Sequence, residues 1–338
     1  MSVLYLSEAE VDQLTEMPAA LEAVEEAFVQ LSTGKATNVP RNRARAPGIV
    51  LHSMSAAAEY LGRAGWKQYT TTRSGARFLV GLYAASGELE ALIEADRLGQ
   101  YRTGAVTGVA IRALADPAAD TLGLIGSGLQ AQTQLEAAAA VRPLRRVRVF
   151  SRSRARREQF AQTNAARLGI EIEPVASAAA AAAGSSIVVT ITNAKQPVLE
   201  NESIDGGTLI CAAGGNDLDR TEIAPELIAR IDAIVCDSVA ACRQEAGELA
   251  EWLKHPEKSP PLELADLVAG SKSLCATGET TVLFKSVGLA IEDLALAARV
   301  VDRARALGCG CLLPVAAGRT SGGAVSEREE TPSPPRVD

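Results

Sequence analysis

The sequence predicts a two-domain α/β protein, in which a doubly wound parallel sheet is joined to an α+β domain. The chain has 338 residues, which is too many for one small core and suits two domains. Residues 121–237 alternate short apolar runs with helical stretches, a pattern typical of a parallel sheet covered on both faces. Residues 39–94 instead hold short segments rich in β-branched and aromatic residues, which indicate strands. The two parts therefore differ in architecture.

Two helices are expected at the start of the chain. The side chains of Ser7 and Glu10 are spaced to satisfy the first free amides of a helix reciprocally. A second helix begins near Pro18, where apolar residues recur at helical spacing, and Gly34 ends it. Both helices belong to the first domain.

A hairpin and a longer helix follow. Residues 78–83 and 89–93 predict two strands joined by a tight turn. Asp96 is expected to cap a helix that runs to about residue 115. Within this helix Gly104 and Gly108 are one turn apart, so another backbone is expected to approach closely on that side.

The second half of the chain carries the parallel sheet. An alanine-rich stretch at 176–183 is taken as a crossover helix because alanine has the highest helix propensity. A last helix, at 288–307, follows the sheet and is expected to return to the first domain. The composition of residues 326–338 predicts a disordered tail. The expected strands are residues 121–125, 147–150, 187–192, 208–213 and 234–237.

Composition excludes several classes of function. A net charge of -7 argues against nucleic-acid binding, which depends on a basic surface. The chain has no apolar run of the length that a membrane helix needs, and its N-terminus has no basic flank, so we expect no membrane segment and a cytoplasmic location. Six cysteines without a C-x-x-C pair and only two histidines predict no metal site.

A glycine-rich turn indicates a dinucleotide site. It lies between the apolar run 121–125 and a helix, which is the context of a Rossmann-type pyrophosphate turn. The first glycine permits the tight turn, the second lets backbone amides approach the anion, and the helix N-terminus stabilises it. The residues expected to bind the cofactor here are Gly126, Ser127, Gly128, Leu129, Gln130 and Ala131.

The end of the second strand favours NADP(H) over NAD(H). An acidic residue at this position would bind the ribose 2′-hydroxyl of NAD, and none is present. Residues 142–157 hold eight arginines and no carboxylate. Guanidinium and hydroxyl donors match a 2′-phosphate, so Ser151, Arg152 and Ser153 are expected to form its pocket. Arg156 and Arg157 are expected on a solvated helix face.

Several short motifs occur in a distinctive order. They are Pro40-Arg41, Met54, Gly65-x-Lys67, Leu98-x-x-x-Arg102-Thr103-Gly104-Ala105, the turn at Gly126, Gly214-Gly215-Asn216 and residues 284–293. This order resembles the ornithine cyclodeaminase and mu-crystallin family over nearly the whole chain. Residues 102–105 and 286–293 are the most specific parts of the resemblance.

The resemblance implies a domain division and a dimer. It implies a substrate-binding and dimerisation domain of residues 1–115 and 296–325, a Rossmann domain of residues 116–295, and a homodimer. It also implies that Arg41, Lys67 and Arg102 hold the carboxylate of a small amino or imino acid. Lys67 is the candidate proton donor because a buried lysine beside other cations has a lowered pKa.

Two departures from the family pattern distinguish among its activities. Cyclodeaminases use a glutamate two residues before Met54 and an aspartate directly after the later Gly-Gly, and here these positions hold His52 and Asn216. Losing both carboxylates disfavours ammonia elimination. For His52, a proton-handling role and a structural role both remain open. Asn216 and Thr103 are candidate contacts for the cofactor.

We therefore expect NADPH-dependent reduction of a cyclic 2-imino acid, such as 1-pyrroline-2-carboxylate or 1-piperideine-2-carboxylate. The alternatives are an amino-acid dehydrogenase or N-alkyl amino-acid reductase that accepts an open-chain imine, and an ammonia lyase of the cyclodeaminase type. A non-catalytic NADPH-binding protein, as known among mu-crystallins, is the alternative outside enzymology.

Overall fold

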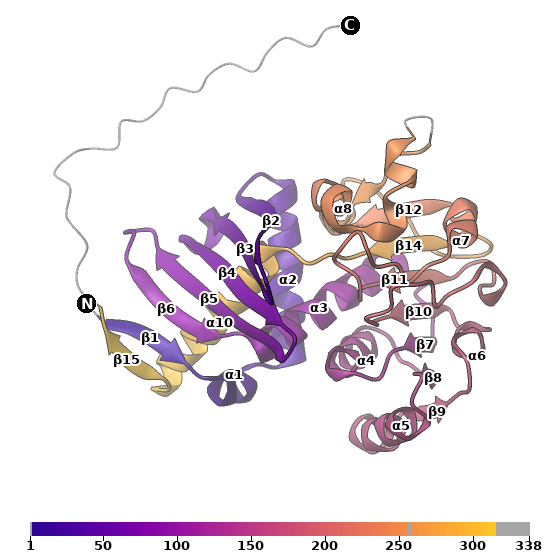
Figure 1. Ribbon diagram of the computed structural model, residues 1–338, viewed down its shortest axis with the longest axis horizontal. Helices are drawn as coiled ribbons and strands as arrows, with labels where there is room; N and C mark the ends of the chain where they lie inside the picture. The colour runs from indigo at the N-terminus through magenta and orange to yellow at the C-terminus, as the bar shows by residue number, and fades with distance from the viewer. Residues whose placement is uncertain (1, 256–257, 316–338) are drawn as a thin grey trace, which may run out of the picture.

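The computed structural model describes residues 2–255 and 258–315, and the tail predicted at 326–338 lies outside them. These residues form two β-sheets side by side, each with its own helices (Figure 1). The predicted α/β class with a doubly wound parallel sheet is confirmed. No helix in this part of the chain is long and apolar enough to cross a membrane.

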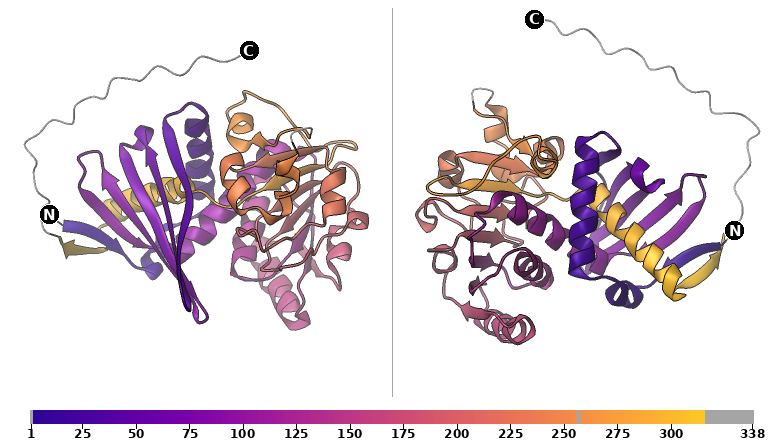
Figure 2. Two further views of the ribbon diagram at one scale, coloured as in Figure 1. Left: turned by 45° about the horizontal axis from the view of Figure 1, so that its top comes forward. Right: turned by 180° about the vertical axis from the view of Figure 1, so that it is seen from behind.

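The first sheet has seven strands in the order β15-β1-β6-β5-β4-β3-β2. Helices α2 and α10 lie together on one face of this sheet, as the rear view in Figure 2 shows. The hairpin predicted around residues 86–87 is confirmed, with Leu82 opposite Ala91. The strands are β1 (Ser2–Leu6), β2 (Ala36–Ala46), β3 (Ile49–Ala58), β4 (Arg63–Thr72), β5 (Gly75–Ala84), β6 (Leu89–Glu94) and β15 (Cys311–Pro314).

The second sheet has eight strands in the order β13-β12-β14-β11-β10-β7-β8-β9, and its paired strands are parallel. From β7 the chain adds β8 and β9 on one side and β10 on the other, so a topological switch point lies between β7 and β10. The strands are β7 (Thr121–Ile125), β8 (Arg146–Phe150), β9 (Glu171–Pro174), β10 (Ile187–Thr190), β11 (Leu209–Ala212), β12 (Ala233–Cys236), β13 (Leu262–Glu263) and β14 (Val282–Lys285).

The predicted helices are present with small changes at their ends. The helix at 96–115 is confirmed, but Asp96 is its first residue and Ala95 holds the capping position. The helices are α1 (Glu8–Leu14), α2 (Met17–Ser32), α3 (Asp96–Leu114), α4 (Leu129–Val141), α5 (Arg154–Leu168), α6 (Ala178–Ala182), α7 (Pro225–Arg230), α8 (Val239–Glu245), α9 (Leu264–Val268) and α10 (Ala290–Leu307).

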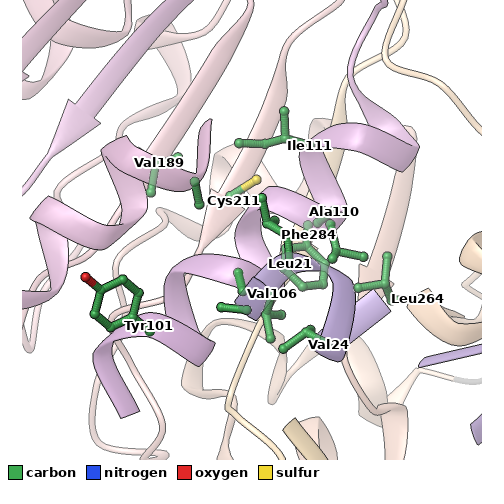
Figure 3. Packing of buried hydrophobic residues seen from close by; sticks show 14 of the residues in the cluster. Leu21, Val24, Tyr101, Val106, Ala110, Ile111, Val189, Cys211, Leu264 and Phe284 are labelled. Atoms are coloured by element: carbon green, nitrogen blue, oxygen red, sulfur yellow. The ribbon is translucent and has the colours of Figure 1, made fainter. Parts of the chain in front are cut away.

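Helix α3 packs closely against α4, as the two glycines in α3 predict. A Cβ atom at Gly104 would overlap the backbone of Thr133, and one at Gly108 would overlap the Leu21 side chain and press on Ala137. The apolar side chains of α2 and α3 meet the second sheet here (Figure 3). This shared core fixes α3, which carries a candidate site residue, between the two sheets. Its members include Leu21, Val24, Val106, Ala110, Ile111, Leu264 and Phe284.

The chain returns from the second sheet to the first through a turn held by a buried carboxylate. Asp237 Oδ2 accepts hydrogen bonds from Ser286 Oγ (2.9 Å) and from the amides of Val287 and Gly288 (both 2.7 Å). Helix α10 then runs along the first sheet from Ala290 onward. The domain boundary expected at residue 296 therefore lies inside this helix.

Candidate active site

The glycine-rich turn closes the end of β7 and opens α4. Gly126 has a φ of 128°, and a Cβ atom there would overlap the carbonyl oxygen of Ile191, so only glycine fits this position. Gly128 precedes α4 as its capping residue, and nothing lies within 4 Å of a Cβ built on it. Gly128, Leu129 and Gln130 line a cleft, so the N-terminus of α4 borders a space of the kind in which helix N-termini bind a pyrophosphate.

A cleft of about 870 Å³ extends from this turn along the end of the second sheet. Its lining includes Gly126, Ser127, Gly128, Leu129 and Gln130, together with Ser151, Arg152 and Ser153. The turn and the end of β8 are joined because Ser127 Oγ donates to Ser151 Oγ at 2.8 Å. Ala131 is fully buried beneath the turn and does not line the cleft.

Two arginines face the cleft at the end of β8. Arg152 and Arg156 both line it, and neither guanidinium has an ion pair or hydrogen bond among the described residues. Arg156 is exposed, as expected for a solvated helix face, and because α5 begins close to the strand its first turn also borders the cleft. Arg157 instead donates to the carbonyl of Ser151 at 3.0 Å and lies over the Phe150 ring.

A second, smaller cleft of about 360 Å³ adjoins the first. Gln130 and Arg220 line both clefts, so the two spaces meet at these residues. One wall comes from β2, β3, β4 and α3, and the other from the loop after β11. Six cations line this cleft: Arg41, Arg43, Arg45, Lys67, Arg102 and Arg220. The lining carboxylates are Asp96 and Asp217.

Lys67 is buried at the inner end of the second cleft. Its ammonium donates to Asp293 Oδ1 at 2.7 Å, and the lysine side chain is 4% exposed. Burial lowers the pKa of Lys67 to about 8, and Arg102 and Arg41 add to this effect while Asp293 opposes it. The side chain therefore carries a proton at neutral pH that it releases more readily than an exposed lysine does.

Arg102 lies beside Lys67 and shares its carboxylate. Arg102 Nη1 donates to Glu292 Oε2 at 2.7 Å, and its Nε lies 3.2 Å from Asp293 Oδ1. Burial raises the pKa of Glu292, against the effect of Arg102. The guanidinium fits only because residue 288 is a glycine: a Cβ atom at Gly288 would overlap it.

Arg41 and Arg43 both line the second cleft, and both pair with Glu245. Arg41 is buried, pairs with Glu245 and donates to the carbonyl of Val287 at 3.0 Å. Arg43 lies 3.3 Å from Glu245 and donates to the backbone carbonyl of Asn216 at 2.6 Å. Arg45 lies at the rim, 3.8 Å from Asp217.

His52 lies in the wall of the cleft, stacked on Tyr69 with ring centroids 4.1 Å apart. Its Nε2 is 3.1 Å from Thr71 Oγ1, and its buried Nδ1 has no hydrogen-bond partner in the part of the chain that the structure describes. Burial lowers the pKa of His52 to about 4, and Arg43 and Arg41 lower it further. The imidazole is therefore neutral at neutral pH and does not act as an acid there.

The two remaining candidates differ in position. Thr103 lines neither cleft: its hydroxyl donates to the carbonyl of Gly99 at 2.7 Å, within α3. Asn216 lines the second cleft. Sequence reasoning missed Arg220, whose only signal was a cation shortly after the Gly-Gly pair, and it gave no role to Glu245.

Comparison with known proteins identifies the family of this chain. The model of the ornithine cyclodeaminase/mu-crystallin family matches residues 2–308. The chain belongs to this family. It is 32% identical over 268 residues to a Delta(1)-pyrroline-2-carboxylate reductase of Bacillus cereus, which covers 76% of this chain and 82% of the relative.

Solved structures of similar proteins share the fold over most of the chain. The structure of Thermococcus litoralis Delta(1)-pyrroline-2-carboxylate reductase in complex with NADH and L-proline matches with a TM-score of 0.86 and 30% identity, covering 91% of this chain and 99% of that one. An archaeal alanine dehydrogenase dimer with bound NAD matches with a TM-score of 0.87 and 27% identity, covering 93% and 99%.

Proposed function

We propose that this protein reduces a cyclic 2-imino acid, such as 1-pyrroline-2-carboxylate, to the cyclic amino acid with a nicotinamide cofactor. The observation that carries the proposal is the placement of Lys67, Arg102 and Arg41 at the inner end of a small cleft that opens into a dinucleotide-sized one. The named activity of the relative from Bacillus cereus, and the proline in the Thermococcus complex, support the same substrate class.

The residues of the larger cleft fit NADP(H). The open N-terminus of α4 would hold the pyrophosphate, and Ser151, Arg152 and Ser153 would hold the 2′-phosphate, with Arg156 beside them. The unpaired guanidinium groups of Arg152 and Arg156 support a phosphate rather than a bare ribose. When bound, the reduced nicotinamide supplies a hydride to the imine carbon.

The chain's own residues position the substrate and move one proton. Arg102 and Arg41 would hold the substrate carboxylate as guanidinium forks, which fixes the planar C=N carbon toward Gln130 and the larger cleft. Lys67 would protonate the imine nitrogen before reduction, because its lowered pKa makes it an effective acid near neutral pH. Asp293 holds the ammonium in place.

Cyclodeamination is disfavoured because His52 and Asn216 stand where the cyclodeaminases have carboxylates. His52 is neutral and stacked on Tyr69, and Asn216 is anchored through its carbonyl to Arg43, so neither supplies the carboxylate that would bind an amine and activate water. Asp217 lies at the rim, 3.8 Å from Arg45. Reduction of an open-chain imine is the second candidate, supported by the similar archaeal alanine dehydrogenase.

We also propose that the protein is a homodimer formed through the outer face of the first sheet. Large apolar side chains on the strands of this sheet are exposed, although they are of the kind that proteins bury at interfaces. They are Val39, Ile49, Leu51, Leu79 and Tyr83. Helices α2 and α10 occupy the opposite face.

The activity is tested by following NADPH oxidation with 1-pyrroline-2-carboxylate, 1-piperideine-2-carboxylate, and pyruvate with methylamine. We expect turnover of a cyclic imine and a loss of at least a hundredfold in kcat/KM in Arg102→Met. Ornithine is the substrate that tests the cyclodeaminase alternative. Conversion of ornithine to proline and ammonia without added reductant would contradict the proposal.

A further inference from the structure

The second cleft holds more cationic groups than one substrate carboxylate needs. Arg41, Lys67 and Arg102, at its inner end, are each paired with a buried carboxylate behind them. A second group of cations lies further out. It comprises Arg43, Arg45 and Arg220. Arg43 also lies 3.3 Å from the buried Glu245, and Arg45 lies 3.8 Å from Asp217, which lines the cleft.

In the first sheet, side chains at paired positions on neighbouring strands form rows across the sheet. The outer group lies at the row next to that of the inner group. Met54 on β3 is opposite Lys67, whereas His52 is opposite both Arg43 and Tyr69. Two residues along a strand separate the rows, which corresponds to about 7 Å at about 3.3 Å per residue. A short molecule with an anionic group at each end can therefore bind the inner row with one group and the outer row with the other.

The outer row also contains buried donors without partners. Arg43 Nε and His52 Nδ1 are buried and have no hydrogen-bond partner among the described residues, as is also true of Arg41 Nε and Arg102 Nε in the inner group. His52 is 9% exposed, and its Nε2 is engaged by the Thr71 hydroxyl, which leaves Nδ1 as the donor in the neutral ring when Nε2 accepts. The guanidinium of Arg220 has no hydrogen bond or ion pair among the described residues. Buried unpaired donors are costly, so these groups indicate an acceptor on a ligand.

We propose that the outer row is a second carboxylate site, and that the substrate is a short 2-imino acid with a distal carboxylate. The proposal rests on the reductase function above, and among 2-imino acids it favours one with a distal carboxylate over an unsubstituted cyclic imine such as 1-pyrroline-2-carboxylate. Arg102, Arg41 and Lys67 hold the carboxylate next to the imine carbon, while Arg43, Arg220 and His52 hold the distal one. Charge-assisted hydrogen bonds from guanidinium groups then discriminate against a neutral side chain of the same shape.

Binding of amino acids tests the site without requiring turnover. The protein saturated with NADP⁺ is titrated by calorimetry with L-glutamate and L-glutamine, and with L-aspartate and L-asparagine, because each pair has nearly the same shape and differs in charge. We expect the acid of at least one pair to bind ten times or more as tightly as its amide. Equal binding within both pairs, or no binding of either acid, would overturn the proposal.

Variants show which residues produce the preference for an acid over its amide. In Arg220→Gln and in Arg43→Gln the ratio of acid to amide affinity is expected to fall toward one. Arg73→Gln, an exposed arginine in the turn after β4, is the control and keeps the wild-type ratio. The ratio is internal to each variant, so a general loss of structure lowers both affinities and leaves it unchanged. A wild-type ratio in both cleft variants would overturn the assignment.

Activity and binding measured on the same preparation of the protein distinguish a failure of this proposal from a failure of the reductase function. NADPH oxidation with 1-pyrroline-2-carboxylate but no acid preference would overturn the second carboxylate site alone. A clear acid preference without turnover of any imino acid would support the site and contradict the reductase function.

Discussion

Lys67 shows how burial and neighbouring charge set the chemistry of a single residue. Desolvation and two arginines lower its pKa to about 8, and the carboxylate of Asp293, 2.7 Å away, limits the shift. A lysine with this pKa is protonated at neutral pH and loses its proton in the alkaline range. If it is the proton donor, reduction is fast below about pH 8 and slows above it.

Removing Asp293 is expected to shift this pH dependence downward. In Asp293→Asn the group that raises the pKa of Lys67 is gone, so the pH at which kcat/KM falls to half moves below the wild-type value. A pH profile from pH 6 to 9 measures the shift. Asp266→Asn, which removes the exposed partner of Lys272, is the control. An unchanged midpoint in Asp293→Asn would show that another group donates the proton.

Cofactor preference is expected to depend on Arg152. Arg152→Gln removes a guanidinium from the cleft wall, so kcat/KM with NADPH is expected to fall at least tenfold while the value with NADH changes little. Arg154→Gln is the matched control, because that exposed side chain pairs with Glu158 on α5. A wild-type preference in Arg152→Gln would place the 2′-phosphate elsewhere.

At the scale of structural elements, the turn between β7 and α4 contains two glycines that are needed for different reasons. Gly126 is needed for its φ of 128° and for the close approach of Ile191. Gly128 has an ordinary backbone, and a Cβ there would meet only open space. Gly126 is therefore required by the fold, and Gly128 is the one that we propose serves binding.

The two glycines give a paired prediction. Gly126→Ala is expected to lower the free energy of unfolding by about 1–3 kcal/mol, from backbone strain and overlap. Gly128→Ala is expected to keep its stability within about 0.5 kcal/mol but to bind NADPH at least tenfold more weakly, because the Cβ occupies the space of the pyrophosphate. Thermal melting and calorimetry measure both effects. A destabilised Gly128→Ala would contradict the open-space interpretation.

Elements with strong local patterns could be predicted from sequence, and those made by distant contacts could not. The turn at Gly126 and the close packing at Gly104 follow from local sequence. Strand β15 exists because it pairs with β1, about 300 residues away, and β1 has no alternation that marks it as a strand. Arg220 comes to the cleft only because the loop after β11 folds back over the end of the sheet, which no spacing in the sequence reveals.

At the scale of the whole molecule, the return of α10 joins the two sheets and completes the site. The turn held by Asp237 leads into Glu292 and Asp293, which pair with Arg102 and Lys67 from the first domain. These two ion pairs hold α10 against β4 and α3, whereas Arg41 of the first sheet pairs with Glu245 on α8, beside the second sheet. The site therefore forms only when both domains are in place.

The outer face of the first sheet is expected to hold the dimer together. In the double variant Leu51→Glu with Leu79→Glu, two exposed apolar residues of this face become charged, so the mass measured by light scattering is expected to fall from dimer to monomer. Leu307→Glu, an exposed residue at the end of α10, is the control. A wild-type mass in the double variant would place the interface elsewhere.

The central claim is that two adjoining clefts bring an imino acid and a phosphorylated nicotinamide cofactor together for reduction. The most direct measurement is the stoichiometry of NADPH consumed and proline formed from 1-pyrroline-2-carboxylate by the wild-type protein. We predict one NADPH oxidised for each proline, and loss of both signals in Lys67→Met. Proline formation without net NADPH oxidation, or no reaction with any cyclic 2-imino acid, would contradict the claim.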